Sequence, residues 1–503
     1  MKIVLTGNDL TVDKVWDIAV KGAEVEIGPE ADATLEASRK LVYDLVDADV
    51  PVYGFNTGVG WNKDHKIAKE FFEEFNRKLI YCHTFGVGAE ASEAEVRAVM
   101  AVRLNCLLLG YTGVQPAVAR RYAELLNAGV HPVVPEKGSV GEADLTQLAH
   151  IGLAMIGEGE VNYKGRRMSS AEAHKLAGLE PVVLGPKDGL AVVSSSSFSA
   201  GEAALVFKEL AELADMGDII SSLSLEGLNG NTSPLEAEVM AARGLAGQAK
   251  CAENMRGYLE GSDIYEAYPG KPVQDPLCFR GAAYVNGSLR DALEYAGKYL
   301  FIQMNSTDDN PCLLLKEKRI ISNSNFETTT LATAMEMLSI VLSHVSRMSC
   351  YRMLRLANPE LTHLSRFLSH DGGESHCFGT IQKCFASLDT EIRHLSNPCS
   401  VDYLSLSGSI EDHANNTPLV VQHLRQIVQD LQHIYGIELI HACQAIELRK
   451  RQGGFTLGKG TAAAYEAFRR ALPLYTNDRP LAPDVKKAYE FVKSAALIES
   501  VKR

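Results

Sequence analysis

The sequence lacks the features of an exported, membrane-spanning or nucleic-acid-binding protein. It contains no cluster of lysine and arginine that could line a phosphate backbone, and 50 basic residues against 63 acidic ones give a formal net charge of −13. The N-terminus has no basic region followed by an apolar core, and the uncharged apolar stretch from Leu145 to Gly157 is too short to span a bilayer. We therefore expect neither nucleic acid nor a membrane as a partner.

The ten cysteines also lack any organised spacing. No CxxC pair occurs, and no arrangement is typical of a disulfide framework or a zinc site. This usage is typical of reduced thiols, so we expect a cytoplasmic protein without a bound metal. A hydrophobic content of 46% and a charged content of 22% are those of a folded globular protein, which excludes a disordered or fibrous chain.

Hydrophobic periodicity predicts a mainly α protein. Two short strand-like runs, KIVLTG and AEVEIG, lie near the N-terminus, and the pattern then changes to long helical periods. Apolar residues recur every three or four positions from Thr330 to Leu356, which predicts one long amphipathic helix. Similar stripes run through four other segments: Ser92 to Leu109, Gly201 to Leu225, Leu289 to Ile302 and Pro418 to Leu448.

These stripes predict a long-helix bundle with a small N-terminal α/β portion. We expect residues 1–200 to carry the strands and the active-site loops, and residues 201–503 to form the bundle core and the C-terminal helices. Long helices with several apolar faces often bury the surplus face against another subunit, so a homo-oligomer is expected.

The loops between the predicted helices are the segments that bear on function. Glycine, serine, asparagine and aspartate gather there around isolated aromatic and acidic residues. Such loops commonly carry binding and catalytic groups on a rigid scaffold. The six loops are YGFNTGVG, GSVGEADL, QDPLCFRG, NSTDDNP, SNSNFE and SIEDH.

Several of these motifs follow one another in an order that resembles the histidine and aromatic amino acid ammonia-lyase family. The motifs are YGFNTGVGW (53–61), RAVMAVRLNCLLLGYTGV (97–114), GSVGEADLTQLAHIGLAMIGEGE (138–160), KDGLAVV (187–193), VQDPLCFR (273–280), NSTDDNP (305–311), SNSNF (322–326) and PCSVDYLSLSGSIEDH (398–413). The resemblance implies that family's large helical bundle. It also implies a homotetramer whose active sites combine loops from more than one subunit.

The resemblance breaks where the family makes its electrophile, a methylidene-imidazolone formed from an Ala-Ser-Gly triad after GSVG. Here GSVG is followed by Glu142, Ala143 and Asp144, and the nearby Ser139 precedes a valine. Cyclisation requires a serine that dehydrates and an unhindered glycine nitrogen that attacks the preceding carbonyl. We therefore expect no prosthetic group. Four further positions depart from the family pattern: Ser194 for Asn, Leu277 for Tyr, Gln303 for Glu, and Glu327 where His is frequent.

Other positions match the family's active-site motifs. These are Tyr53, His83, Arg280, Asn310, Phe326 and Glu411. Retention of these residues without the electrophile favours an eliminase whose substrate does not need it. A trimethylammonium group has no lone pair with which to attack an electrophile and carries a permanent charge, so it can leave directly.

Within the family the resemblance is greatest to the ergothionase type, which eliminates trimethylamine from ergothioneine, a betaine, to give thiourocanate without the prosthetic group. Three alternatives stay open: a catalytically silent scaffold, an eliminase acting on hercynine, and an ordinary histidine or aromatic ammonia-lyase whose electrophile comes from other residues.

The resemblance assigns the chemical roles. Tyr53 is the predicted general base for the β-proton, and Arg280 suits the substrate carboxylate because guanidinium pairs with it in a bidentate way. Lys383, in the helix-like GTIQKCFASL, and Glu411 are candidates for recognising the thione ring as negative charge develops there. The alternative for Lys383 is a solvated helix face.

The remaining assignments concern binding. His83 is expected to hold the carboxylate, to tune Tyr53, or to be a satisfied core histidine, and Asn310 and Ser194 are expected to contact the substrate. Aromatic faces bind quaternary ammonium groups, so Phe326, Tyr53, Phe55 and Trp61 are candidates. We expect Asp144 to cap the helix that begins at Leu145, whereas Glu142 is left between capping and attraction of the trimethylammonium group.

Overall fold

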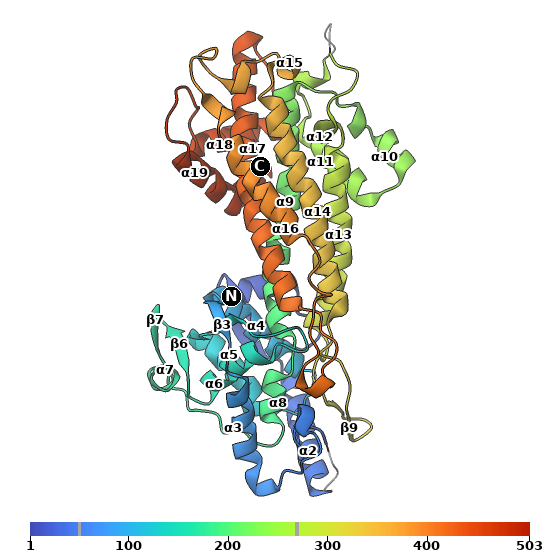
Figure 1. Ribbon diagram of the computed structural model, residues 1–503, viewed down its shortest axis with the longest axis vertical. Coiled ribbons are helices and arrows are strands. Elements are labelled where there is room, and N and C mark those ends of the chain that lie inside the picture. The colour runs from blue at the N-terminus through green and yellow to red at the C-terminus, as the bar shows by residue number, and fades with distance from the viewer. Residues whose placement is uncertain (49–51, 267–270, 503) are drawn as a thin grey trace. The chain divides into compact units, whose positions relative to one another are not determined.

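The computed structural model describes residues 1–48, 52–266 and 271–502, and these form a mainly helical protein with small sheets (Figure 1). The chain divides into two compact units. Unit 1 consists of Met1–Lys208, Ala296–Met335 and Pro398–Gln422, and unit 2 of Glu209–Tyr295, Glu336–Asn397 and His423–Arg503. Unit 1 therefore combines the N-terminal region with two later segments, whereas the sequence suggested a single division near residue 200.

The strands all belong to unit 1. β1 (Lys2–Leu5) pairs in parallel with β2 (Glu24–Ile27), so the strands expected from KIVLTG and AEVEIG are confirmed. Alternate residues of β1, Ile3 and Leu5, are buried, as a strand with one covered face requires. The other strands form three small antiparallel sheets: β3 (Val87–Glu90) with β5 (Pro135–Lys137), β4 (Val130–Pro132) with β6 (Glu160–Tyr163) and β7 (Arg166–Ser169), and β8 (Cys312–Leu314) with β9 (Arg319–Ile321).

Eight α-helices of the described residues lie entirely in unit 1. Ser92 and Glu95 form a capping box that starts α4, as expected where a serine precedes an apolar run. Helices α3, α6 and α8 contact one another (Figure 1). The bounds are α1 Val12–Ala19, α2 Pro29–Asp47, α3 Phe72–His83, α4 Glu93–Leu107, α5 Pro116–Ala128, α6 Leu145–Met155, α7 Ser170–Ala177 and α8 Asp188–Val193.

Four long helices contribute residues to both units and confirm the predicted apolar stripes. They are α9 (Ser197–Leu228), α13 (Ala282–Met304), α14 (Thr329–Leu356) and α17 (Thr417–Gly453). The helices that belong to unit 2 alone are α10 (Ala237–Arg243), α11 (Ala246–Tyr258), α12 (Leu277–Arg280), α15 (Pro359–Thr362), α16 (Gln382–Leu395), α18 (Lys459–Ala471), α19 (Ala482–Lys493) and α20 (Ala496–Val501).

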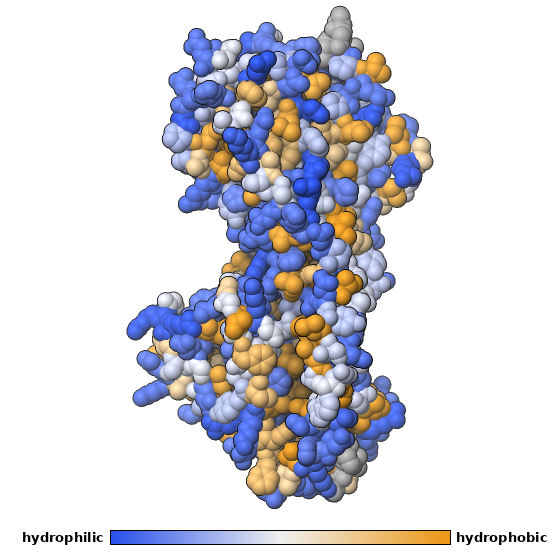
Figure 2. Space-filling model, viewed as in Figure 1, coloured by the Kyte–Doolittle hydropathy of each residue, from blue (hydrophilic) through white to orange (hydrophobic). Residues whose placement is uncertain are grey.

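One helical stretch of the described residues, Asp188–Leu228, is long and apolar enough to cross a membrane. The search for uncharged runs in the sequence overlooked it. Of its most apolar window, 94% is buried inside the protein, which is the behaviour of a core helix. On the face shown in Figure 2, hydrophobic residues are interspersed among hydrophilic ones in each unit.

Candidate active site

A cavity of about 440 Å³ lies within unit 1, where loops from four parts of the chain meet the end of α8. Its size is that of a small-molecule site. Six of the residues predicted to act on or bind the substrate line it: Tyr53, Glu142, Ser194, Asn310, Phe326 and Glu411. The other lining residues are Gly60, Lys63, Gly141, Ala143, Leu145, Leu190, Ser322, Ser324, Glu327, Ile410, Asp412, His413 and Asn415.

Tyr53 is half-buried and its hydroxyl oxygen accepts a hydrogen bond from the Gly60 amide at 2.8 Å. Burial raises the pKa of Tyr53, the Gly60 amide lowers it, and the negative charge of Glu411 raises it further, so that the pKa lies above its ordinary value. The phenol is therefore held in position but is not ionised by the groups of unit 1. A base at this position needs additional positive charge in the occupied site.

Glu142 and Glu411 give the cavity an acidic wall. Burial raises the pKa of Glu142 to about 7, and the charges of Glu411 and Asp412 contribute to the increase while His413 opposes it. The loop that carries Glu142 is fixed by an antiparallel bridge to Glu327 and therefore lies beside Phe326. Glu142 and Phe326 both line the cavity.

Glu327, the partner in this bridge, accepts three hydrogen bonds at one carboxylate oxygen, Oε1. Its carboxylate accepts hydrogen bonds from the Thr329 amide at 3.0 Å, the Thr329 hydroxyl at 2.7 Å and the Asn415 side chain at 2.6 Å. Burial raises the pKa of Glu327, but these hydrogen bonds outweigh it and the net pKa is lowered. Glu327 is therefore an anchor between the 322–329 segment and the start of α17.

Ser194 and Asn310 are positioned by two buried ion pairs. The Arg103 guanidinium contacts Asp308 at 3.0 Å and the Lys187 ammonium contacts Asp309 at 2.7 Å, and all four side chains are at most 2% exposed. Asp308 also accepts hydrogen bonds from the Ser195 hydroxyl and the Ser196 amide. The segments that carry Ser194 and Asn310 are thereby joined, and the Asn310 amide donates a hydrogen bond to the Ser194 hydroxyl oxygen at 3.4 Å.

The comparisons with known proteins agree with this architecture. The model of a family described as aromatic amino acid lyase matches residues 10–470. The chain belongs to the aromatic amino acid lyase family. It is 35% identical to histidine ammonia-lyase of Alkaliphilus oremlandii over 503 residues, covering 100% of this chain and 99% of that protein.

Two solved structures of the lyase fold are similar over nearly the whole chain. Ergothionase from Treponema denticola, crystallised with desmethyl-ergothioneine sulfonic acid, superposes with a TM-score of 0.95 at 44% identity, covering 99% of this chain and 100% of that one. Tyrosine aminomutase from Streptomyces globisporus superposes with a TM-score of 0.95 at 30% identity, covering 100% and 99%. The predicted mainly helical lyase fold is confirmed.

The residues after GSVG in this lyase do not fit the family's electrophile. Ala143, the middle residue, has no hydroxyl group to eliminate. The Asp144 nitrogen, which would have to attack the Glu142 carbonyl, donates a hydrogen bond to the Ser195 carbonyl at 2.7 Å. No chemical step is therefore assigned to a prosthetic group at this position.

The expectation that the Asp144 side chain caps α6 is wrong. Asp144 occupies the N-cap position but makes no side-chain cap hydrogen bond. Its carboxylate instead accepts the Ser199 amide at 2.8 Å and the hydroxyls of Ser199 and Ser139, both at 3.2 Å. Burial raises the pKa of Asp144 to about 7 against the effect of these hydrogen bonds. Asp144 therefore links the loop to the start of α9.

Two aromatic candidates for the ammonium group lie elsewhere. Phe55 is fully buried and packs against Phe72 at a ring distance of 6.1 Å, within a cluster of apolar core residues. Trp61 is 65% exposed and lies directly on Gly408, whose positive φ of 64° and missing side chain permit the close approach. Neither belongs to the lining residues, and Phe326 and Tyr53 remain the aromatic candidates.

His83 ends α3 and is not among the lining residues either. Its Nδ1 atom lies 2.8 Å from the Leu79 carbonyl and 3.3 Å from the Cys82 sulfur. Burial lowers the pKa of His83, but these hydrogen bonds outweigh it and the net pKa is raised. Its partners are those of a satisfied helix-terminal histidine, and its predicted role toward the substrate stays a prediction.

Arg280 and Lys383 belong to unit 2, whereas every lining residue of the cavity belongs to unit 1. Arg280 ends α12 and donates a hydrogen bond to Gln274. Lys383 lies in the first turn of α16, which confirms the predicted helix there, and its side chain is exposed. The sequence motifs grouped these two residues with Tyr53 and Glu411, but the chain does not place them among the residues that line the cavity.

Three titratable residues of the cavity were missed from the sequence: Lys63, Asp412 and His413. Lys63 lies just beyond the YGFNTGVGW motif, and His413 ends the SIEDH motif. The His413 Nε2 atom lies 3.5 Å from a Glu327 carboxylate oxygen. Their position directly beside recognised motifs was the available signal, although a loop lysine and a loop histidine are common without any role.

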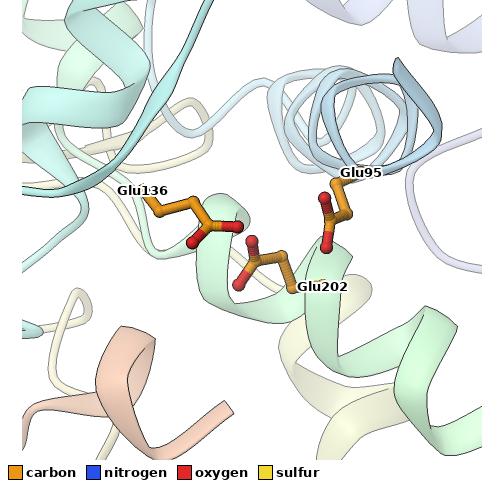
Figure 3. A group of neighbouring side chains, drawn as sticks. All are labelled: Glu95, Glu136 and Glu202. Carbon is orange, nitrogen blue, oxygen red and sulfur yellow. The ribbon is translucent and has the colours of Figure 1, made fainter. Parts of the chain in front are cut away.

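A group of three carboxylates, also missed, lies elsewhere in unit 1. Glu95 from α4, Glu136 from β5 and Glu202 from α9 direct their carboxylates toward one another, with ligand atoms within 4.8 Å (Figure 3). Glu95 closes the capping box by accepting the Ser92 amide at 2.6 Å. We assign no ligand to this group, since converging acidic residues also occur without an ion.

Proposed function

We propose that this lyase eliminates trimethylamine from ergothioneine to give thiourocanate and uses no electrophilic prosthetic group. The observation that carries the proposal is the Glu-Ala-Asp sequence at 142–144, which cannot form the family's electrophile and whose Glu142 and Ala143 line a cavity shared with Tyr53. The 44% identity to an ergothionase structure, against 35% to a histidine ammonia-lyase, supports the choice of substrate.

The reaction needs only a base and a leaving group that already carries its charge. The Tyr53 phenolate removes the proton from the β-carbon next to the ring, and the electrons of that C–H bond form the double bond between the α- and β-carbons. The bond from the α-carbon to nitrogen breaks, and its electron pair leaves with neutral trimethylamine. Tyr53 then returns the proton to solvent.

The raised pKa of Tyr53 is consistent with a base that is activated by its substrate. A quaternary ammonium group in the same cavity supplies a permanent positive charge, which lowers the pKa of a nearby phenol. The phenolate then forms when the betaine is bound. In the empty site, burial and Glu411 keep the phenol neutral.

Arg280 and Lys383 are proposed to reach the active site when subunits assemble. We propose a homotetramer in which the unit 2 of neighbouring subunits supplies Arg280 for the substrate carboxylate and Lys383 for the thione. A cation near the sulfur stabilises the negative charge that develops on the ring as the proton leaves, and Glu411 is proposed to bind the ring from unit 1.

The alternatives differ in substrate or in having no activity: hercynine lacks the sulfur, histidine lacks the charged leaving group, and a silent scaffold turns over none of them.

A substrate panel tests the proposal. The purified protein is incubated in parallel with ergothioneine, hercynine and histidine, and the released amine is identified by proton NMR. Trimethylamine from ergothioneine at a higher kcat/KM than from hercynine is the expected result. Preferred turnover of hercynine would reassign the substrate, ammonia from histidine would indicate an ordinary ammonia-lyase, and no amine from any substrate would indicate a scaffold.

A further inference from the structure

The two carboxylates of the acidic wall, Glu142 and Glu411, are half-buried, and neither makes a side-chain hydrogen bond or ion pair with another described residue. The Glu327 carboxylate, by contrast, accepts hydrogen bonds from Thr329 and Asn415 at its Oε1 atom. A half-buried carboxylate without a partner is costly unless a ligand neutralises it.

The neighbours of Glu142 make a positive ligand more favourable. The titratable groups that share the cavity with it are Tyr53, Lys63, Glu327, Glu411, Asp412 and His413. The carboxylates of Glu411 and Asp412 repel the charge of Glu142, and His413 attenuates this repulsion. The empty site therefore contains repulsion between carboxylates. Binding of a cation with a permanent charge relieves this repulsion.

The surroundings also fit a cation without N–H groups. Glu142 is bridged to Glu327, the residue that follows Phe326 in the chain, and Glu142 and Phe326 both line the cavity. A quaternary ammonium group needs no hydrogen-bond acceptor for each substituent, and an aromatic ring with a carboxylate satisfies it by electrostatics and contact.

We propose that Glu142 is the residue that binds the quaternary ammonium group, together with Phe326, and that it determines the preference of this site for betaines. The inference rests on the proposed function, since it names the part of the site that holds the leaving group. Binding requires the ionised carboxylate, so at neutral pH the ligand binds with release of a proton from Glu142.

The test uses tetramethylammonium, which carries the charge and the methyl groups but no ring. Its affinity for the full-length protein is measured by titration of its methyl signal in proton NMR, which needs no turnover. Imidazole-2-thione, which carries the ring but no charge, is titrated in parallel. The variants are Glu142→Gln, Glu142→Ala and, as a matched control for the loss of one negative charge, Glu24→Gln on the exposed edge of β2.

We expect removal of the Glu142 carboxylate to weaken tetramethylammonium binding by at least about tenfold, since one ion pair in a half-buried site is lost. Binding of imidazole-2-thione should stay within about twofold, and Glu24→Gln should resemble the wild type in both titrations. The wild-type affinity for tetramethylammonium should rise as the pH passes about 7, and this rise should be smaller in the Glu142 variants.

Wild-type tetramethylammonium binding in a folded Glu142 variant would overturn the inference, as would an equal loss of affinity for both probes. Circular dichroism and the melting temperature establish folding, and the alanine variant serves if the glutamine variant does not fold. If ergothioneine is not turned over but the tetramethylammonium result holds, the proposed function fails while the cation site stands. If ergothioneine is turned over but the Glu142 variants bind tetramethylammonium like the wild type, the proposed function stands while the cation site fails.

Discussion

The Gly60 amide donates its hydrogen bond to Tyr53 and not to a backbone carbonyl, at 2.8 Å. The hydroxyl oxygen is therefore an acceptor on this side, and the same amide stabilises the phenolate when the proton has left. Gly60 lies in the loop that carries Lys63, and its neighbourhood includes Glu411, whose Oε1 atom lies 3.9 Å from where a Gly60 Cβ would be. The loop thus connects the proposed base with the proposed ring-binding residue.

Replacement of Tyr53 by phenylalanine should reduce turnover of ergothioneine by about 10² to 10⁴, which is the range for loss of a general base. The ring volume is kept, so the melting temperature should change little. Steady-state kinetics with trimethylamine detection provide the measurement. Activity within a few-fold of the wild type would assign proton removal to another group.

Replacement of Lys383 by methionine tests whether this exposed residue reaches an active site in the assembled protein. The change keeps much of the stem and deletes the charge, so an active-site lysine should cost about 2 to 4 kcal/mol in the barrier for ergothioneine. The loss should be smaller with hercynine, because the sulfur is absent. Wild-type kinetics on both substrates would place Lys383 on a solvated helix face.

The buried pair of Lys187 and Asp309 makes a prediction about stability. Lys187→Met leaves the buried Asp309 carboxylate without its cation, which should destabilise the protein by about 3 to 5 kcal/mol and lower the melting temperature. The double variant Lys187→Met/Asp309→Leu removes both charges and should recover much of this loss. A double variant no more stable than the single one would indicate that the pair has a structural role beyond its charges.

Asp144 predicts a specific dependence of stability on pH. Its pKa is raised from 3.8 to about 7 in the folded protein, so between these values the unfolded chain has lost the proton that the folded chain retains. Stability from this group therefore falls as the pH rises through that window, and it stays low above it. The melting temperature of Asp144→Asn, relative to that of the wild type, should increase from about pH 5 to about pH 8. A constant difference across that range would contradict the assignment.

The helices and strands could be predicted because their buried apolar residues recur at regular spacing along the sequence. The stripe from Thr330 to Leu356 became α14, and the other long stripes likewise became helices. The cavity was predicted in part, because Tyr53 and Glu411 lie in motifs that the family resemblance identifies. Contacts between distant segments carry no such signal, and the Lys187–Asp309 pair joins residues 122 positions apart.

The incorrect expectations also arise because contacts between distant segments leave no signal in the local sequence. Asp144 directly precedes a helix, so the sequence indicated a cap, but its hydrogen bonds go to Ser199 on a different helix. Phe55 lies in the same glycine-containing motif as Tyr53, and nothing in that motif shows that one ring enters the core while the other lines a cavity. The proposed contribution of Arg280 and Lys383 rests on assembly, which a single sequence does not encode in any local pattern.

The central claim is that this lyase works without an electrophile made from its own backbone. The most direct measurement is the intact mass of the purified chain, recorded on the same preparation that releases trimethylamine from ergothioneine. The account predicts the mass of the unmodified polypeptide, because Glu142, Ala143 and Asp144 supply neither a dehydrating serine nor an attacking glycine nitrogen. A mass lower by two water molecules in the active protein would contradict it.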